Sequence, residues 1–253
     1  NHMPRVYKNS SRSPKIDFWK AVKSFVLHRI AVRRQSPDKL QHVIDLVQNL
    51  NGAYPLKSYT RLKATNFGHE VLNGENSLSK MVADHDRLKS LDPNTLGGLY
   101  YKLNTEGIDV FKTLSSQMRT DEYTEEYTSF LRRELDVHDM IHIVMGFDRT
   151  ILSEACVVVA ASKGGGSPYV KWFFIVPTII TRLSEFPSFK RFLEALKIIF
   201  WETPKRCSSI DDWQLIHWES MLDMDIHEVR QKLNIPASTL YKPDFFRVSE
   251  ERT

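Results

Sequence analysis

His138-Asp139-Met140-Ile141-His142, followed after eleven residues by Glu154, is the stretch around which the rest of this chain is arranged. On a helix, His138 and His142 lie four residues apart on one face, and Asp139 precedes His142 by three. Residues 146–150 (GFDRT) predict a tight return, and Thr150 is a suitable N-cap for a second helix that carries Glu154 in its first turn. An antiparallel helix pair would direct Glu154 back towards the two histidines.

Two imidazoles and two carboxylates suit one divalent metal ion. We predict His138, Asp139, His142 and Glu154 as its ligands, with zinc as the first choice and magnesium, iron, manganese or cobalt as alternatives. HxxxH also arises by chance on helices, and nine histidines make that easy. Apolar residues surround both halves of the motif, however, and buried carboxylates and imidazoles need partners. Asp139 or Glu154 could instead stay unligated and serve as a general acid or base, so both are also candidate catalytic residues.

The pattern HDxxH, eleven residues, then Glu resembles the signature of the coenzyme Q biosynthesis protein 4 family. Weaker pieces also resemble that family over residues 88–236: Leu88 and Leu91 ahead of Thr95-Leu96-Gly97 and Tyr100, Arg133, Ile151-Leu152 before Glu154, and a tail over residues 213–233. The second motif position is Asp139, whereas the HExxH zinc proteases use a Glu there as general base. We therefore do not interpret the motif as a protease site.

The resemblance implies a metal-bearing protein that holds a polyprenylated quinone precursor or another isoprenoid lipid and acts on its head group, as a decarboxylase or hydroxylase of a prenylated ring. The alternative that the resemblance implies is a non-catalytic lipid-binding scaffold for other quinone-biosynthesis proteins, so whether the chain is an enzyme stays open. Arg133 and Arg149 are the predicted contacts of an anionic head group. We also expect a homodimer.

Composition predicts one all-α domain over residues 13–240, between a disordered or tag-proximal tail (1–12) and a C-terminal tail (241–253). Asn1-His2 ahead of Met3 is typical of a tag remnant. Two cysteines give no disulfide framework. The net charge of +4 does not imply nucleic acid. No signal peptide or membrane span is visible, so we expect a location that is cytoplasmic or peripheral on the inner face of a membrane.

The first 37 residues carry nine Lys or Arg and one acid, Asp17. Trp19, Val22, Val26 and Ile30 repeat at helical spacing within them and predict an amphipathic basic helix. The first interpretation is a helix that docks this apolar face on the core. The alternative is a helix that rests on an anionic membrane surface.

Three further patterns carry predictions. Residues 155–161 and 169–183 are apolar nearly all round, and we predict that they line a tunnel for an isoprenoid tail near the metal. Residues 211–233 predict the last strong helical region. His85-Asp86 is a second His-Asp dipeptide, which would suit a metal-dependent phosphohydrolase of the HD type; this is the third hypothesis for the function.

Overall fold

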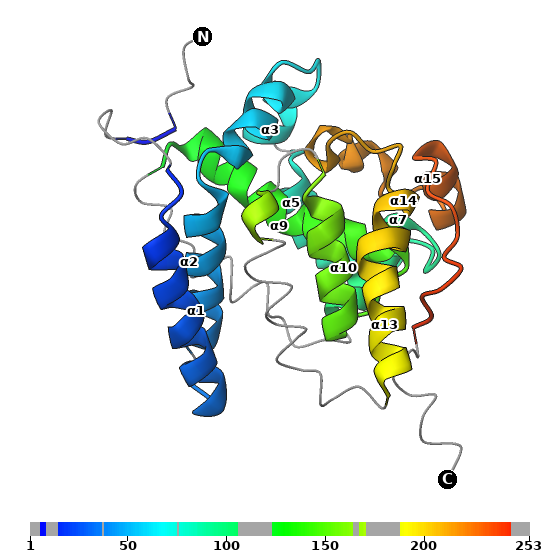
Figure 1. The fold of residues 1–253 in the computed structure, drawn as a ribbon. Helices are drawn as coiled ribbons and strands as arrows, with labels where there is room; N and C mark the ends of the chain where they lie inside the picture. The colour runs from blue at the N-terminus through cyan, green and yellow to red at the C-terminus, as the bar shows by residue number, and fades with distance from the viewer. Residues whose placement is uncertain are drawn as a thin grey trace.

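The computed structural model describes residues 6–8, 15–36, 38–74, 76–105, 123–163, 167–170 and 188–243. These residues are mostly helical and contain no β-strand (Figure 1), which confirms the predicted all-α class. In chain order the helices are α1 (Phe18–Arg33), α2 (Lys39–Asn51), α3 (Tyr54–Lys63), α4 (Gly68–Asn73), α5 (Leu78–Ala83), α6 (His85–Ser90), α7 (Leu96–Thr105), α9 (Glu125–Met145), α10 (Ile151–Ala161), α11 (Pro168–Val170), α13 (Phe189–Lys197), the π-helix η3 (Ile198–Glu202), α14 (Thr203–Arg206), the 3-10 helices η4 (Trp213–Leu215) and η5 (Trp218–Met221), and α15 (Ile226–Lys232).

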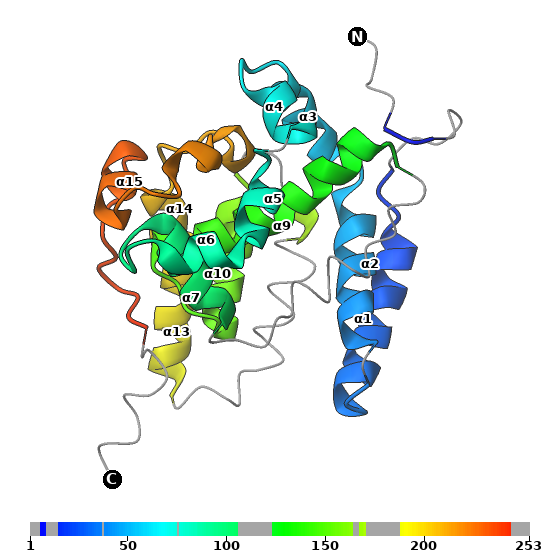
Figure 2. The ribbon, with the colours of Figure 1, turned by 180° about the vertical axis from the view of Figure 1, so that it is seen from behind.

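Helix α9 is the central helix of the described structure. It begins at Thr124, whose side chain accepts a hydrogen bond from the Tyr127 N–H, and its first turn holds Glu125 and Glu126, which favour the positive end of the helix dipole. It packs against α4, α5, α7, α10, α15 and η4, as the view from behind shows for α5 and α7 (Figure 2). The C-terminal half of α9 lies in the largest apolar cluster, and Tyr127 and Phe130 of its N-terminal half lie in a second one.

Residues near both predicted boundaries of the domain contact the central helices. Val6 is buried, and its carbonyl accepts a hydrogen bond from the Thr124 N–H at 2.9 Å, although residues 1–12 were predicted as a tail. Tyr241 is buried as well, one residue beyond the predicted end of the domain. The folded body therefore includes residues at both predicted boundaries.

Helices α1 and α2 form a hairpin that stands beside the body in both ribbon views. Its own small core consists of Ala21, Leu46 and Leu50 with Val170 of α11. The predicted apolar face of α1 is exposed, which makes the core-docking interpretation wrong: the exposed fractions are 81% for Trp19, 38% for Val22, 50% for Val26 and 41% for Ile30. None of the helices in the described ranges combines the length and the apolar character that a membrane crossing requires.

Residues 211–233 do not form one continuous helix, contrary to the prediction. Trp213 and Trp218 are both buried, and residues five apart on an α-helix point in directions about 140° apart. Breaking the helix into η4 and η5 lets both indoles face the core, where their rings stack at a centroid distance of 6.3 Å. Each indole N–H finds a carbonyl acceptor, Ala160 for Trp213 and Trp213 itself for Trp218. Helix α15 then starts separately at the N-cap Asp225.

A glycine in α7 fixes the position of this C-terminal part. The Gly97 N–H donates to the carbonyl of Leu222 at 2.8 Å. A Cβ at this position would lie 3.0 Å from that oxygen and 2.6 Å from a methyl group of Leu91. Close packing is therefore the reason for this glycine.

A buried ion pair links α9 to η5. The Arg133 guanidinium donates to the Glu219 carboxylate and to the carbonyl of Ile216, and Arg133 is only 2% exposed. The same Glu219 oxygen accepts the N–H of Leu78 at 3.1 Å, so the pair also holds the start of α5. Removing one partner of such a pair leaves an uncompensated charge in the core.

We predict that Arg133→Met lowers the free energy of unfolding by roughly 3–5 kcal/mol, because Glu219 would remain buried without its cation. Urea denaturation measures this loss. Arg132→Met is the matched control, since Arg132 is the exposed neighbour on the same helix, and we expect it to cost less than about 0.5 kcal/mol. Adding Glu219→Met to Arg133→Met should recover stability; a further loss of similar size would contradict this account.

Because of Glu134, the free energy of unfolding should depend on pH. Burial, helped by the charge of Asp212, raises the pKa of Glu134 to about 8. The pKa of Glu134 is higher in the folded protein than in the unfolded chain. Its contribution to the free energy of unfolding is therefore fully present below the unfolded pKa, and it is lost as the pH rises through the folded pKa. We expect Glu134→Gln to match the unsubstituted protein near pH 4, below the unfolded pKa, and to be more stable than it near pH 9. Thermal unfolding of both proteins at both pH values measures this. The same difference in stability between them at the two pH values would contradict the prediction.

Candidate metal centre

The turn between α9 and α10 sets the geometry of the candidate site. Helix α9 ends at Gly146, whose φ of 68° lies in the left-handed region. The Gly146 N–H donates to Ile143 O and the Phe147 N–H donates to His142 O at 2.8 Å, which is the Schellman arrangement. Arg230 of α15 adds hydrogen bonds to the carbonyls of Val144 and Ile143. The last carbonyls of α9 are thus satisfied, and the chain reverses as predicted.

Asp148 organises the start of α10. Its Oδ1 accepts hydrogen bonds from Thr150 N at 2.9 Å, from Thr150 Oγ1 at 2.6 Å and from Ser153 Oγ at 2.6 Å. Thr150 is the N-cap, as predicted, and accepts from the Ser153 N–H. This hydrogen-bonded turn places Glu154, in the first turn of α10, opposite the two histidines of α9.

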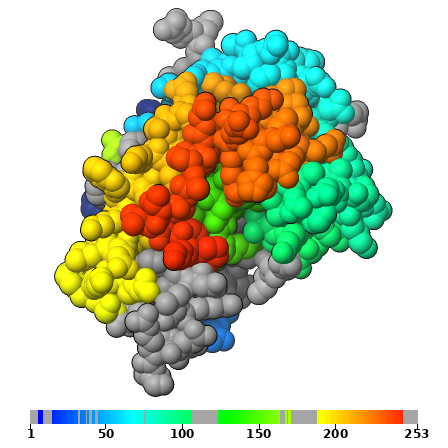
Figure 3. Space-filling model, turned by 90° about the vertical axis from the view of Figure 1, so that its right-hand side faces the viewer, coloured from blue at the N-terminus to red at the C-terminus, as the bar shows by residue number. Residues whose placement is uncertain are grey.

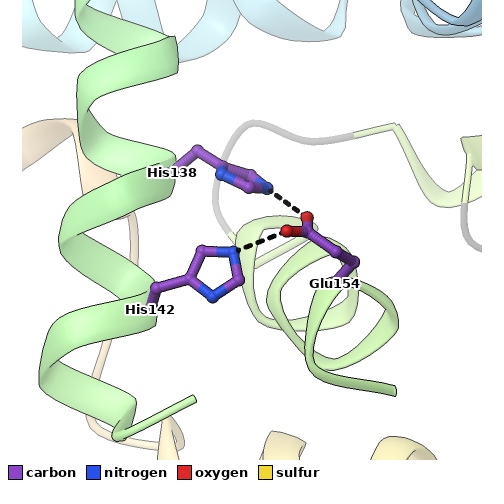
Figure 4. A group of neighbouring side chains, drawn as sticks. All are labelled: His138, His142 and Glu154. Carbon is purple, nitrogen blue, oxygen red and sulfur yellow. Dashed lines mark ion pairs between the residues drawn. The ribbon is translucent and has the colours of Figure 1, made fainter. Parts of the chain in front are cut away.

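The carboxylate of Glu154 faces both imidazoles (Figure 4). Its Oε2 lies 3.4 Å from His138 Nε2, and its Oε1 lies 3.3 Å from His142 Nε2. Two ligand atoms that each lie about 2.1 Å from an ion at tetrahedral angles are about 3.4 Å apart. The three residues each offer one ligand atom, and these atoms all lie within 4.8 Å of one another. Within the described residues, they form the group of His and acidic side chains that could hold a metal ion.

His142 gives a further observation that fits an ion. The residue is 1% exposed, and among the described residues neither ring nitrogen has a partner with satisfactory hydrogen-bond geometry. An unsatisfied buried polar group costs about 1–3 kcal/mol. A cation held between His142 and the other two residues would satisfy Nε2. The Glu154 side chain is 40% exposed, so the cluster is open on that side.

The electrostatics of the cluster reflect its close contacts. Burial by itself would raise the pKa of Glu154, but the two imidazoles outweigh burial and hold that pKa well below its usual range. Burial disfavours the charged form of His138, yet the carboxylates of Asp139 and Glu154 outweigh it and raise the pKa of His138 to about 9. The lowered pKa keeps the Glu154 carboxylate ionised, as a metal ligand must be. The raised pKa favours the protonated form of His138, so an ion that binds there has to displace a proton.

Asp139, the fourth predicted ligand, lies on the other side of His138. Its Oδ1 is 3.7 Å from His138 Nδ1, the ring nitrogen opposite the one that faces Glu154, and its Oδ2 is 3.7 Å from Arg149 Nη2. The structure therefore brings three of the four predicted ligands together, and the ligation by Asp139 stays a prediction. A carboxylate behind a ligating histidine commonly fixes the tautomer and the orientation of its ring.

The two predicted head-group arginines have different surroundings. Arg133 is occupied by Glu219 and Ile216 in the core. Arg149 lies beside Asp139, donates to Asn104 Oδ1 at 3.1 Å, and is 22% exposed in its side chain. Arg149 is the arginine that borders the cluster.

A polar group next to the site was missed by the sequence reasoning. Asp136 accepts hydrogen bonds from Ser79 and from the Tyr100 hydroxyl, the latter at 3.3 Å. Burial raises the pKa of Asp136 to about 7, the Ser79 hydrogen bond opposes this, and the charge of Asp139 adds to it. The spacing of Asp136 and Asp139, three apart on one helix, was a visible signal. Nothing in the sequence pointed to Ser79.

The remaining predictions on sites fall elsewhere. His85 and Asp86 are exposed at the start of α6 and do not belong to the ligand group of the described residues. Residues 155–161 lie in α10, which is mostly buried. The second predicted tunnel wall, residues 169–183, lies outside the described residues except for Tyr169 and Val170.

Comparison with known proteins gives a consistent result. The family model described as "Coenzyme Q (ubiquinone) biosynthesis protein Coq4" matches residues 32–238. The protein named "Ubiquinone biosynthesis protein COQ4, mitochondrial" of Lachancea thermotolerans is 27% identical over 186 residues, which are 73% of this chain and 53% of that protein. The homologue named for the same protein in Drosophila virilis is 24% identical over 69% of this chain and 63% of its own length.

The fold has a solved counterpart. A crystal structure of a protein from Nostoc punctiforme, assigned provisionally to ubiquinone biosynthesis, superposes with a TM-score of 0.56 at 16% identity, over 87% of this chain and 98% of that chain. At this identity the likeness concerns the fold alone. The chain spans about half the length of the curated yeast relative named above. Because the family model covers most of the chain, including the HDxxH motif and Glu154, the chain belongs to the coenzyme Q (ubiquinone) biosynthesis protein Coq4 family.

Proposed function

We propose that this chain acts in ubiquinone biosynthesis, where it holds a divalent metal beside a polyprenylated ring compound and removes the ring carboxyl group. The observation that carries the proposal is the meeting of His138, His142 and Glu154 at ligand-like distances, with buried ring nitrogens of His142 that lack hydrogen bonds among the described residues. The names of the relatives supply the pathway. The geometry supports a metal site, and the removal of the ring carboxyl group is what the family resemblance implies.

His138, His142 and Glu154 would hold the ion, and Asp139 would orient His138 from behind or move into the ligand shell as the fourth ligand. A ligand set of two nitrogens and one carboxylate with an open side suits zinc first, and magnesium, iron, manganese or cobalt as alternatives. The exposed side of Glu154 leaves room for substrate. A bound ion would supply a Lewis acid for the negative charge that develops on the substrate.

The proposed reaction is balanced without an oxidant. The bond between the ring carbon and the carboxyl carbon breaks, its electron pair stays on the ring, carbon dioxide leaves, and the ring carbon takes up one proton. Asp139 would hold or deliver this proton if it stays unligated, and Glu154 would do so only in the alternative in which it does not bind the ion. Arg149 would receive the anionic head group, since it borders the cluster and is partly exposed.

The isoprenoid tail would lie along α10. Its side chains are apolar over residues 155–161, and Val158 packs between the main core and the core of the hairpin. A ring compound held at Glu154 would have its tail directed along this apolar helix. The tail is therefore the part of the ligand that we expect to supply most of the binding energy.

We predict that the purified chain contains about one metal ion per molecule and releases labelled carbon dioxide from a prenylated 4-hydroxybenzoate-type compound under air. The double substitution His138→Ala, His142→Ala should abolish both, because it removes the two nitrogen ligands. Glu154→Gln should lower the release at least tenfold, roughly the lower limit for a group in the ligand shell or in proton transfer. Elemental analysis and scintillation counting measure the two quantities.

His85→Ala is the matched control, since it removes an exposed histidine outside the cluster. Full metal occupancy in the double variant would refute the ligand assignment. Metal binding without carbon dioxide release, with any of the five metals, would favour the alternative of a lipid-binding scaffold for other quinone-biosynthesis proteins. Phosphate release that depends on His85 would favour the phosphohydrolase hypothesis.

A specific observation favours a peripheral membrane contact through α1. Trp19, Val22, Val26 and Ile30 form an exposed apolar row on this helix, and Phe18 is 42% exposed beside it. Lysines and arginines flank the row at Lys15, Lys20, Lys23, Arg29, Arg33 and Arg34. Apolar and aromatic groups flanked by basic ones suit the interface of an anionic membrane, from which a lipid substrate must be collected.

We predict salt-sensitive binding of the chain to vesicles that contain anionic lipids, and a loss of most of this binding in a Trp19→Ala, Val26→Ala variant. Flotation at low and at high salt measures it. Trp201→Ala is the matched control, because Trp201 of η3 is 71% exposed on another part of the surface. Binding that survives the α1 substitutions and fails with Trp201→Ala would move the contact to that surface. The predicted homodimer is tested by light scattering of the same samples.

A further inference from the structure

One carboxylate holds the C-terminal strap, which we define as residues 238–241, through hydrogen bonds. Glu202, the last residue of η3, is 5% exposed. It accepts hydrogen bonds from three strap N–H groups, those of Thr239 at 2.6 Å, Leu240 at 2.8 Å and Tyr241 at 3.1 Å. The hydroxyls of Ser238 and Thr239 donate to it as well. Hydrogen bonds to a charged acceptor are about twice as strong as neutral ones, so the strap is held in one place.

The end of the strap reaches the turn that carries the metal site. Tyr241 is buried, and its ring packs edge-on against Phe147 at a centroid distance of 5.0 Å. Its hydroxyl accepts the Asp148 N–H at 3.2 Å and lies 2.8 Å from Ser153 Oγ. In the space-filling view the C-terminal residues, in red, lie across this face beside α13 in yellow, with the green of the central helices next to them (Figure 3).

These hydrogen bonds form a closed ring with one consistent direction. Ser153 has a single hydroxyl proton, which it donates to Asp148 Oδ1 at 2.6 Å. The Tyr241 hydroxyl therefore donates to Ser153 Oγ and accepts from the Asp148 N–H. Such chains of hydrogen bonds strengthen one another in a buried setting. Ser153 is 0% exposed and directly precedes Glu154.

We propose that Tyr241 is a positioning residue for Glu154: through Ser153 and Asp148, the strap fixes the first turn of α10 at the rotation that aims the Glu154 carboxylate at His138 and His142. The inference rests on the proposed metal site. Glu202 also positions Glu154, but indirectly, because its hydrogen bonds to the strap determine where Tyr241 lies. Partners that orient metal ligands without touching the metal typically change metal affinity by about 10–100-fold.

The test is a cobalt titration of the metal-free full chain, followed by the absorption bands of bound Co2+. Tyr241→Phe keeps the ring and removes the hydroxyl, and we expect affinity to fall about tenfold or more with altered bands. Tyr54→Phe is the matched control, because Tyr54 is partly exposed and packs against Tyr169 in the hairpin region. Ser153→Ala should weaken binding similarly, and the double variant should be no worse than either single one, since both break the same ring.

A second measurement needs no metal. Amide hydrogen exchange at residues 151–155 of the metal-free protein should be faster in Tyr241→Phe than in Tyr54→Phe, while the midpoint of thermal unfolding stays within a few degrees. Should Tyr241→Phe fold poorly, Glu202→Gln replaces it in both measurements, with the same direction expected.

The outcomes separate the two proposals. Absence of Co2+ binding by the unsubstituted chain would refute the metal site, and the exchange measurement would still decide whether Tyr241 holds the turn. Normal Co2+ binding and unchanged bands in Tyr241→Phe would overturn the positioning role while leaving the metal site intact. Additive losses in the double variant would also overturn it, because they would show that Tyr241 and Ser153 act separately.

Discussion

The structure depends on one constraint: a single carboxylate on α10 must face two imidazoles on α9. An α-helix advances about 100° per residue, so a turn one residue longer or shorter would direct Glu154 away from His138 and His142. The Schellman turn at Gly146, the bonds of Asp148 to Thr150 and Ser153, and the Arg230 bonds to the α9 carbonyls all fix the same register. The strap adds a support from the far end of the chain.

The polar residues of α9 explain why so many helices surround it. Arg133, Asp136, Asp139 and His142 are spaced by three and form a largely buried row, and each has a neighbour on a different element. Glu219 of η5 meets Arg133, Tyr100 of α7 meets Asp136, Arg149 of the turn lies near Asp139, and Glu154 of α10 faces His142. Since each buried polar group needs its partner, the row specifies where those elements must pack, beyond what apolar contacts alone would determine.

Patterns between residues close in sequence predicted the helices, caps and turns that depend on such short-range interactions. Helical spacing, the N-cap Thr150 and the turn at Gly146 were sufficient to predict the antiparallel pair of α9 and α10. The break in residues 211–233 was missed because it comes from two tryptophans that must share one core. The apolar row of α1 was assigned to the core for a similar reason: periodicity shows that a face exists, and only the tertiary structure shows that α2 packs on a different one. The strap could not be predicted, since Glu202 and Tyr241 meet through contacts 39 residues apart.

The three residues of the candidate site are unequally exposed, and this bears on how the proposed lipid could reach the proposed metal. His142 is 1% exposed in its side chain, His138 18%, and Glu154 40%, so access increases from α9 towards α10. Desolvation on the α9 side strengthens any electrostatic interaction made there, whereas the α10 side stays accessible. A ring head group could therefore reach the proposed metal from the α10 side, and the rigidity of the first turn of α10 would decide how precisely the head group is placed.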